Sequence, residues 1–408
     1  MRLISSLSVI FLLCVFSCKD AKETEKDNDS EKALINKDLN WSERMMLSEI
    51  ERFPKAWQLD FHEKPVWSYP NGLVLKGTQD LFEKTRKEVY LDYIFSYTDT
   101  LIDSTGTIKT YKPETKNLDM LKSGHVLLWL YEKTGEEKYK KAADELRNQL
   151  IDQPRTESGG FWHKKRYTNQ MWLDGLYMAH PFYARYAGKF EKDSAQKVYN
   201  DIIHQFELTQ KHHLDKKTGL LYHGWDESKN QEWADPETGT SPNFWLRAMG
   251  WYGMALVDVL GYLPEDYEKR EKIIGYLRDF ALAVVNYQDD SGLWYQVLDK
   301  QNKEGNYLEA SGSAMFVYTL AKGVRKGYLN KSYLENADKG YKGILNNFIS
   351  VEEDGKVNLN QVCAVAGLGG NPYRDGSFEY YVNEKIRPND PKGTGPFILA
   401  SLEMENAP

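Results

Sequence analysis

One carboxylic acid in this sequence stands in an unusual setting for its type. Asp174 lies in the segment 169–178, NQMWLDGLYM, among large apolar and aromatic residues at the start of a predicted helix. A poorly solvated carboxyl group disfavours its charged form, so we expect the pKa of Asp174 to be raised. A carboxylic acid that stays protonated near neutral pH is what general acid catalysis requires. A lone Asp at this point would simply cap the helix, but the residues downstream favour a catalytic interpretation.

A second cluster of aromatic residues, with an arginine among them, follows at residues 244–252, FWLRAMGWY. In a helix, Arg247 and Trp251 lie four residues apart and share a face. A guanidinium group can hold a carboxylate through two hydrogen bonds while a Trp ring covers a sugar, so this cluster suits an anionic sugar. The commoner arrangement, a core Trp pair with the Arg reaching solvent, stays open.

The composition of the 408-residue chain narrows the function classes. The chain is 41% hydrophobic, as in a globular protein, and its 11 Trp and 27 Tyr weakly indicate carbohydrate binding. The formal net charge of −7, without basic blocks, argues against nucleic-acid binding. The 8 His are scattered without metal-ligand spacing, so we expect no metal site.

The N-terminus is typical of an exported bacterial lipoprotein. A short basic start precedes an apolar stretch, residues 3–16, that is too short to span a bilayer as a helix. We expect residues 1–18 to be the signal peptide, with Cys18 as the lipid-attachment residue that holds the protein at a membrane. Residues 19–38, rich in Lys, Asp and Glu, are predicted to form a flexible tether. Only Cys363 then remains in the mature body, so no intramolecular disulfide is available.

Helical periodicity dominates the chain after residue 40. Apolar residues recur at helical spacing through most of this region, and strand-like alternation is confined to short pieces. The segments with this periodicity are 41–53, 78–97, 118–133, 136–151, 170–187, 194–212, 244–261, 266–286, 309–326, 331–348 and 394–405. No linker rich in Pro, Gly or Ser divides them, so we predict a single catalytic domain over residues 39–408.

A weak internal repeat indicates how these helices are arranged. Turns around Gly160, Gly219, Gly292 and Gly355 each follow a predicted outer helix and precede the next inner one. Each step holds one helical hairpin and a loop, and is longer than a tetratricopeptide repeat. Such hairpins, closed into a toroid, predict an all-α fold, the (α/α)6 barrel. We expect its inner helices to begin near Asn117, Gln170, Phe244, Leu308, Gly376 and Gly393.

In such a barrel the inner helices run in the same direction, so their N-termini open on one face. The polar residues within the first turns of the predicted inner helices are Asp119, Asp174, Arg247 and Glu309. His163 and His223 lie in loops on the same face. Separate positions in the chain therefore predict a single pocket.

With these residues assembled, the chain resembles the unsaturated rhamnogalacturonyl hydrolases and, more distantly, the unsaturated glucuronyl hydrolases. The resemblance covers essentially the whole mature domain. Its most specific pieces are GFWHK at 160–164, MWLDGLYM at 171–178 and FWLRAMGW at 244–251. It implies that Asp174 is the general acid and that Asp119 is the second acidic residue. The substrate-binding residues that it implies are His163, Lys164, His223, Trp245, Arg247 and Trp251.

The resemblance implies a glycoside hydrolase acting on oligosaccharides that polysaccharide lyases release, which carry a C4=C5 double bond in the terminal uronic acid. Asp174 would protonate C4, water would add at C5, and the resulting hemiketal would open and expel the remaining sugar, without a metal or organic cofactor. A negative charge on Asp119 would raise the pKa of Asp174 further. The double bond removes the stereochemistry at C4, so a pectic and an ulvan-derived substrate both stay open.

Two other interpretations fit parts of the sequence. A non-catalytic glycan-binding lipoprotein would share the lipid anchor, the aromatic residues and the helices, but it would not need a buried acid opposite Asp119. Another (α/α)6 carbohydrate-active enzyme would need a separate acid and base, for which Glu309 and Asp226 are the spare carboxylates. We favour the hydrolase of unsaturated uronides.

Overall fold

The computed structural model describes residues 34–407, which belong to one compact unit. The predicted signal peptide at 1–18, its Cys18 and most of the predicted tether at 19–38 lie outside the described residues. Within the described part, no helix combines the length and the apolarity needed to cross a membrane.

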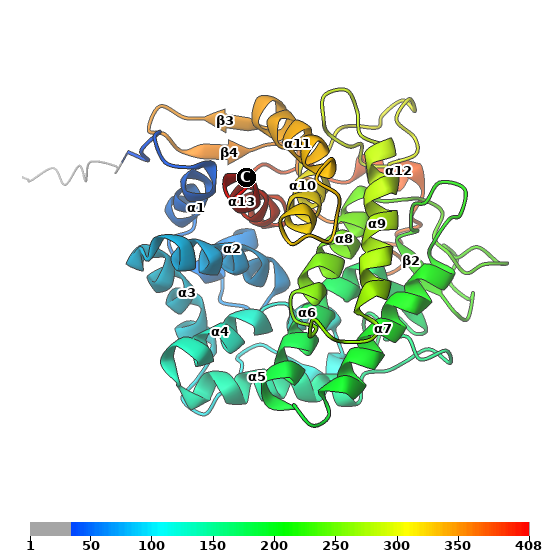
Figure 1. Cartoon of the computed structure of the whole chain (residues 1–408), viewed down its shortest axis with the longest axis horizontal. Coiled ribbons are helices and arrows are strands. Elements are labelled where there is room, and N and C mark those ends of the chain that lie inside the picture. The colour runs from blue at the N-terminus through cyan, green and yellow to red at the C-terminus, as the bar shows by residue number, and fades with distance from the viewer. Residues whose placement is uncertain (1–33, 408) are drawn as a thin grey trace, which may run out of the picture. The chain divides into compact units, whose positions relative to one another are not determined.

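Six helices form the inner wall of a closed ring (Figure 1). Each inner helix packs against the next, and the last packs against the first. In chain order they are α2 (Tyr69–Thr85), α4 (Gly124–Thr134), α6 (Leu173–Phe190), α8 (Leu246–Leu260), α10 (Ala310–Arg325) and α13 (Pro391–Glu405). Their outer partners are α3 (Glu88–Leu101), α5 (Glu137–Ile151), α7 (Ala195–His212), α9 (Arg270–Asn286), α11 (Tyr333–Asn347) and, on α13, α1 (Trp41–Arg52). The predicted (α/α)6 barrel is confirmed.

Inner and outer helices differ in how much of their surface is apolar. Every residue of α8 is buried, as expected for a helix that is enclosed on all sides. The outer helices α5 and α7 bury one face and leave charged residues on the other. The result is one continuous core with residues from α1 through α13, which holds the N-terminal ends of the inner helices in place.

Three predicted boundaries are wrong. The inner helix expected from near Asn117 begins at Gly124, and Asp119 lies before it in a short 3-10 turn, Leu118–Leu121. The single helix expected at 78–97 is two helices, α2 and α3. Pro70 lies in the first turn of α2, where its fixed φ suits a helix and its missing N–H has no partner to lose, and Arg86 ends that helix with a left-handed φ of 58°. The inner helix expected near Gly376 is replaced in the ring by α2, and Gly376 precedes only the short α12 (Phe378–Asn383).

The turns after the outer helices follow the predicted repeat. Gly219, Gly292 and Gly355 have positive φ values of 75°, 88° and 85°. A Cβ atom at Gly292 would lie 2.2 Å from the carbonyl oxygen of Lys339, so this turn requires glycine.

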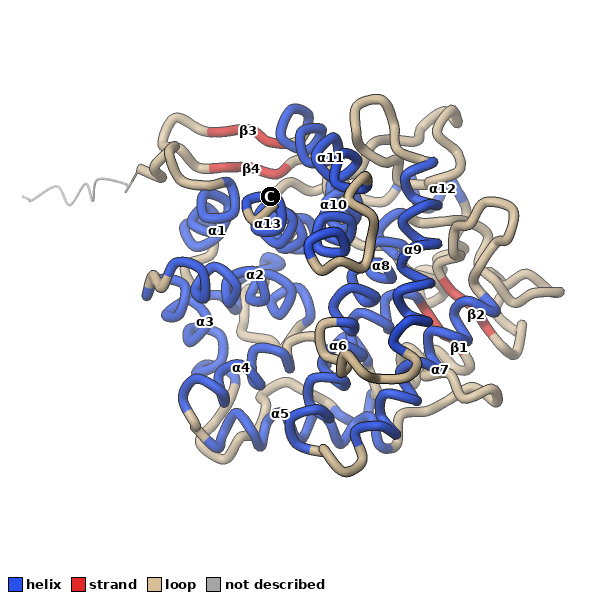
Figure 2. The backbone as a smooth tube through the Cα atoms, viewed as in Figure 1, coloured by secondary structure: helices blue, strands red, loops and turns tan. Residues whose placement is uncertain are grey.

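Strands are short and lie between the helices (Figure 2). The antiparallel pairs are β1 (Gln170–Trp172) with β2 (Gly224–Asp226), and β3 (Ile349–Val351) with β4 (Val357–Leu359). The first pair matters for function, because β1 runs directly into α6.

Candidate active site

A short antiparallel ladder brings two of the predicted site residues together. Strand β2 begins one residue after His223, and Trp172 at the end of β1 lies opposite Gly224. The amide of Leu173 donates to the carbonyl oxygen of His223 at 3.0 Å, which extends the ladder by one residue. The next residue, Asp174, therefore lies in the first turn of α6 beside His223.

The carboxyl group of Asp174 and the imidazole of His223 face each other. Asp174 Oδ2 lies 3.1 Å from His223 Nε2, but the two atoms are not aligned for a hydrogen bond, and neither has another partner within the described protein. On the other side of the imidazole, the hydroxyl of Tyr381 lies 2.8 Å from Nδ1. The Asp174 side chain is 14% exposed, but Oδ2 itself is buried against His223, so a ligand would meet the other carboxylate oxygen.

The expected rise in the pKa of Asp174 is wrong for the protein without substrate. Burial does raise this pKa, but the imidazoles of His223 and His163 lower it, and the net result is a pKa below the ordinary value for Asp. The charge on Asp119 acts upward, as expected, with a smaller effect. Burial also lowers the pKa of His223 itself, despite the neighbouring Asp174.

Asp119 is the centre of a second charged group. Lys164 Nζ lies 2.5 Å from Asp119 Oδ2, and His163 Nε2 lies 3.2 Å from Oδ1. Burial alone would raise the pKa of Asp119, but Lys164 and His163 hold this pKa well below its usual range. Oδ1 of Asn117 accepts a hydrogen bond from the backbone amide of Asp119 at 3.1 Å and so caps the turn that carries Asp119. Asp119 is thus a carboxylate whose charge is balanced by its neighbours.

Aromatic rings enclose both imidazoles. Trp172 stacks on His163 with ring centroids 4.8 Å apart, and it meets His223 edge-on at 5.3 Å. Trp245 lies over His223 at 4.8 Å and stacks on Tyr381 at 5.8 Å. These contacts hold the imidazole of His163 beside Asp119 and that of His223 beside Asp174.

Arg247 and Trp251 lie deeper in the barrel. The side chain of Arg247 is 1% exposed, and its guanidinium group lies 4.8 Å from the Trp245 ring, so it does not reach solvent. Its hydrogen-bond acceptors are the hydroxyl of Ser311 and the carbonyl oxygens of Cys363 and Ala364. Trp251 is also 1% exposed and stacks on Tyr177 at 5.3 Å. Their roles as substrate contacts stay predictions.

The two spare carboxylates hold backbone in place. Glu309 is the N-cap of α10, and its oxygens accept from Ser311, Gly312 and Cys363 at 2.7 to 3.0 Å. The oxygens of Asp226 accept from Ser228, Asn230 and Gln231 at 2.7 to 3.0 Å. This geometry does not favour either residue as a second acid or base.

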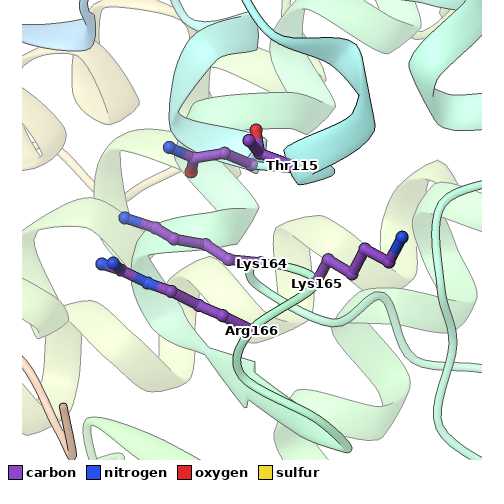
Figure 3. Close-up of a pocket in the computed structure, with 5 residues that line it drawn as sticks. Thr115, Lys164, Lys165 and Arg166 are labelled. Carbon is purple, nitrogen blue, oxygen red and sulfur yellow. The ribbon is translucent and has the colours of Figure 1, made fainter.

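Two cavities lie beside this site, and Arg166 lines both. The first, of about 420 Å³, is lined by Thr115, Asn117, Lys164, Lys165 and Arg166. In Figure 3, Lys164 and Arg166 run side by side, whereas Lys165 points away from both. The second cavity, of about 370 Å³, is lined by Arg166, Tyr167, Gln170, Gln231, Gly370, Asn371, Pro372 and Arg374. Both volumes fall in the range of ligand-binding cavities. Among residues 34–407, no group of three or more His, Cys, Asp or Glu side chains is placed to hold a metal ion.

Three residues of the site were missed in the sequence. Tyr381 comes from α12, and Gln296 joins it to Trp245 by accepting the indole N–H at 3.2 Å and donating to the Tyr381 carbonyl at 3.0 Å. Tyr167 stacks on Trp172 at 4.6 Å. Tyr381 and Gln296 lie outside the recognised motifs, and only the closed ring brings them near His223. Tyr167 carried one signal, since it directly follows a run of three basic residues.

A ring of helices that presents two carboxylates, two imidazoles and several aromatic rings at the start of its inner helices is an (α/α)6 barrel with a site suited to carbohydrate. Residues 41–407 match the model of Glycosyl Hydrolase Family 88, and the chain belongs to this family. The protein is therefore a glycosidase by family, which sets aside a purely glycan-binding role.

Individual relatives agree with this assignment. A solved glycoside hydrolase of family 105 from C. acetobutylicum ATCC 824 is 48% identical, covers 90% of this chain and 100% of its own, and superposes with a TM-score of 0.86. The unsaturated rhamnogalacturonyl hydrolase YesR of Bacillus subtilis is 28% identical over 328 residues, which are 78% of this chain and 86% of that protein. The unsaturated glucuronyl hydrolase of Bacillus sp. GL1, at 12% identity and a TM-score of 0.64 over 89% of this chain and 95% of its own, shares the fold.

Proposed function

We propose that this family 88 hydrolase removes the 4,5-unsaturated uronic acid from the non-reducing end of lyase-generated oligosaccharides by hydrating its vinyl ether. The names of several relatives support the proposal. YesR is an unsaturated rhamnogalacturonyl hydrolase, and proteins of Formosa agariphila and Alteromonas sp. are named unsaturated 3S-rhamnoglycuronyl hydrolases. The structural observation that carries the proposal is that the two carboxylates, Asp119 and Asp174, have different neighbours.

Asp119 and Asp174 differ as a reaction with a single proton donor requires. Asp119 faces both an imidazole and the Lys164 ammonium group, whereas Asp174 faces one imidazole at 3.1 Å and forms no ion pair with a Lys or Arg among the described residues. A conventional glycosidase needs a second carboxylate free to act as base or nucleophile across the glycosidic bond. Asp119 is engaged with Lys164 and His163, so the site supports one acid and not two.

In the proposed reaction, Asp174 donates its proton to C4 of the double bond, and positive charge develops at C5 and the ring oxygen. Water then adds at C5 and returns one proton to Asp174, so that no net proton is consumed. The C5 hemiketal opens to a ketone, C1 becomes a hemiacetal, and the leaving sugar departs with a hydroxyl group. His223, 3.1 Å from Asp174, is placed to stabilise the carboxylate between the two proton transfers.

We propose that substrate binding raises the pKa of Asp174 and so produces its protonated form. The carboxylate of the uronic acid adds a negative charge to the site, and the sugar displaces water. Both effects raise the pKa of a neighbouring carboxyl group. The low pKa of Asp174 in the free protein is therefore compatible with an acid role in the complex.

Product analysis in deuterium oxide tests the proposal. We expect a lyase-generated disaccharide to take up one deuterium at C4 of the released uronic acid in rapidly quenched samples. Its ultraviolet absorbance should fall in step with release of the second sugar, and the saturated disaccharide should stay intact. Cleavage of the saturated disaccharide, or release without deuterium at C4, would instead establish attack at C1.

We also propose that the protein is exported and anchored to a membrane through Cys18, on the strength of the basic start and apolar stretch at residues 1–16. Metabolic labelling with tritiated palmitate tests this in a bacterial host. Label should appear in the wild-type protein of the membrane fraction and be absent from Cys18→Ser. An unlabelled wild type, or a labelled variant, would contradict it.

A further inference from the structure

Two arginines converge on one hydroxyl group beside the candidate active site. Arg166 Nη2 and Arg374 Nη2 each donate to the hydroxyl oxygen of Tyr167 at 2.9 Å. The two guanidinium groups are therefore close neighbours of like charge. Neither forms an ion pair with a carboxylate of residues 34–407, and their acceptors are all neutral.

The loop that carries Arg374 holds its guanidinium group in this position. Arg374 also donates to the carbonyl oxygens of Gly369 at 2.7 Å and Leu368 at 2.9 Å. A Cβ atom at Gly367 would lie 2.2 Å from Arg374 Nη1. The guanidinium group therefore occupies space that is free because residue 367 is a glycine. The positive charge is thus fixed in place and not balanced.

Both arginines line the second cavity, of about 370 Å³. The remaining polar side chains of its wall are those of Tyr167, Gln170, Gln231 and Asn371, and the wall contains no carboxylate. Guanidinium groups match the oxygens of sulfate and carboxylate through paired hydrogen bonds. A cavity with two such groups, neutral amides and no acid is complementary to an anion.

Contacts between aromatic rings link the cavity to the site that holds Asp174. Tyr167, which the arginines share, stacks on Trp172 at 4.6 Å, and Trp172 contacts His223 at 5.3 Å. Burial is the main reason for the low pKa of His223, and the charge on Arg374 lowers it further. The arginine pair is thus close enough to act electrostatically on the site that faces Asp174.

We propose that the cavity between Arg166 and Arg374 binds an anionic group on the leaving segment, on the sugar next to the unsaturated uronic acid or on the one beyond it. The group is an oxyanion, supplied by a sulfate ester on that sugar or by the carboxylate of a further uronic acid. This inference rests on the proposed function, because it places the leaving sugar relative to Asp174. The first cavity suits an anion less well, since Lys164 is paired with Asp119 and Lys165 points away from Lys164 and Arg166 (Figure 3).

Three unsaturated oligosaccharides test the proposal with matched variants. The substrates carry a neutral leaving sugar, the same sugar as a sulfate ester, or a leaving segment with a second uronic acid. Arg166→Gln removes one guanidinium from an exposed position, and Lys165→Gln removes the neighbouring charge as a control. We expect kcat/KM for one anionic substrate to exceed that for the neutral one by roughly 10- to 100-fold, as for hydrogen bonds to charged groups.

That preference should be lost in Arg166→Gln and kept in Lys165→Gln. The anionic substrate that loses its advantage identifies sulfate or carboxylate as the natural group. Equal kcat/KM for all three substrates in the wild type, an equal effect of Arg166→Gln on all three, or a loss caused by Lys165→Gln would each overturn the inference. Failure to cleave any unsaturated substrate would instead overturn the proposed function.

Inorganic sulfate tests the cavity without turnover. At matched ionic strength, sulfate should raise the Tm of the wild type more than chloride does, and this excess should be smaller in Arg166→Gln but unchanged in Lys165→Gln. Equal stabilisation of wild type and Arg166→Gln by sulfate would overturn the anion site, whatever the catalytic result.

Discussion

Asp174 takes its chemistry from neighbours that are distant in the chain. Its own helix supplies the position, the loop before β2 supplies His223, and α12 supplies the Tyr381 hydroxyl behind that imidazole. The carboxyl group is consequently buried but not isolated. Its protonation depends on what binds opposite, which makes the acid role sensitive to substrate and to pH.

Replacing Asp174 with Asn should remove turnover while leaving the fold intact. The amide keeps the shape of the side chain but has no acidic proton to transfer, and general acid catalysis contributes about 10²- to 10⁴-fold. The loss of ultraviolet absorbance measures turnover, and calorimetry measures binding of the uncleaved substrate. Asp193→Asn, an exposed acid after the C-terminal end of α6, is the control. Turnover near the wild-type rate would assign the acid role to another residue.

The pH dependence of kcat should differ from that of kcat/KM. An acid must be protonated to act, so activity falls as pH rises through its pKa. The pKa of Asp174 is lowered in the free protein, by imidazoles that outweigh burial, and the substrate carboxylate raises it in the complex. We expect the alkaline limb of kcat to lie at higher pH than the limb of kcat/KM, since the two report the complex and the free enzyme. Coincident limbs would show that substrate does not change this pKa.

Arg247→Lys should impair substrates with a free uronate carboxylate more than their methyl esters. Lys keeps the charge but loses the planar pair of N–H groups. The comparison is informative because Arg247 already donates to the carbonyl oxygens of Cys363 and Ala364. Ratios of kcat/KM for acid and ester give the readout. Equal losses on the acid and the ester would show that Arg247 serves to hold the backbone at Cys363 and Ala364 in place.

At the scale of elements, caps and ladders decide which carboxylates are available for chemistry. The β1–β2 ladder aligns Asp174 with His223, whereas the first turn of α10 uses both oxygens of Glu309. A carboxylate thus becomes a catalytic candidate in one inner helix and a cap in another.

Glu309→Gln should lower stability and leave the chemistry nearly unchanged. The amide keeps one acceptor oxygen and loses the other, so we expect the free energy of unfolding to fall by about 1 kcal/mol, as for other lost caps. Thermal and denaturant unfolding measure the loss. Glu335→Gln, exposed in the first turn of α11, provides the control. A fall in kcat of several orders of magnitude would instead make Glu309 the acid.

At the scale of the whole molecule, the ring is closed by helices from the two ends of the described chain. Helix α1 packs on α13, and α13 packs on α2 (Figure 1). Glu49 of α1 is fully buried there, accepting from Arg52 at 2.7 Å and from the hydroxyl of Thr394 at 3.1 Å. Burial outweighs these partners and raises the pKa of Glu49.

The closure should therefore carry a pH-dependent contribution to stability. For an acid with a raised folded-state pKa, the stabilisation is fully present below the ordinary Glu pKa and is lost as pH rises through the folded-state value. Glu49→Gln is neutral throughout, so its Tm should lack this decline, as shown by a wild-type minus variant curve. Glu88→Gln, exposed on α3, should follow the wild type. Parallel curves for wild type and Glu49→Gln would contradict the prediction.

Much of the fold was predictable from the sequence because helical periodicity and turn glycines are local signals. They placed most helices, the repeated turns and the closed ring, and the direction of the inner helices placed Asp119, Asp174, His163 and His223 at one site. The main exceptions were α2, where Pro70 and its neighbours resemble a turn although they begin a helix, and Gly376, which precedes only the short α12. Local patterns determined where each chemical group lies along its own element.

Only the tertiary structure decided what those groups are next to. The lowered pKa of Asp174, the Tyr381 hydroxyl behind His223, the burial of Arg247 and the convergence of Arg166 and Arg374 all depend on distances between segments far apart in the chain. A pKa or an unbalanced charge is a sum over spatial neighbours, and such a sum exists only after the ring has closed.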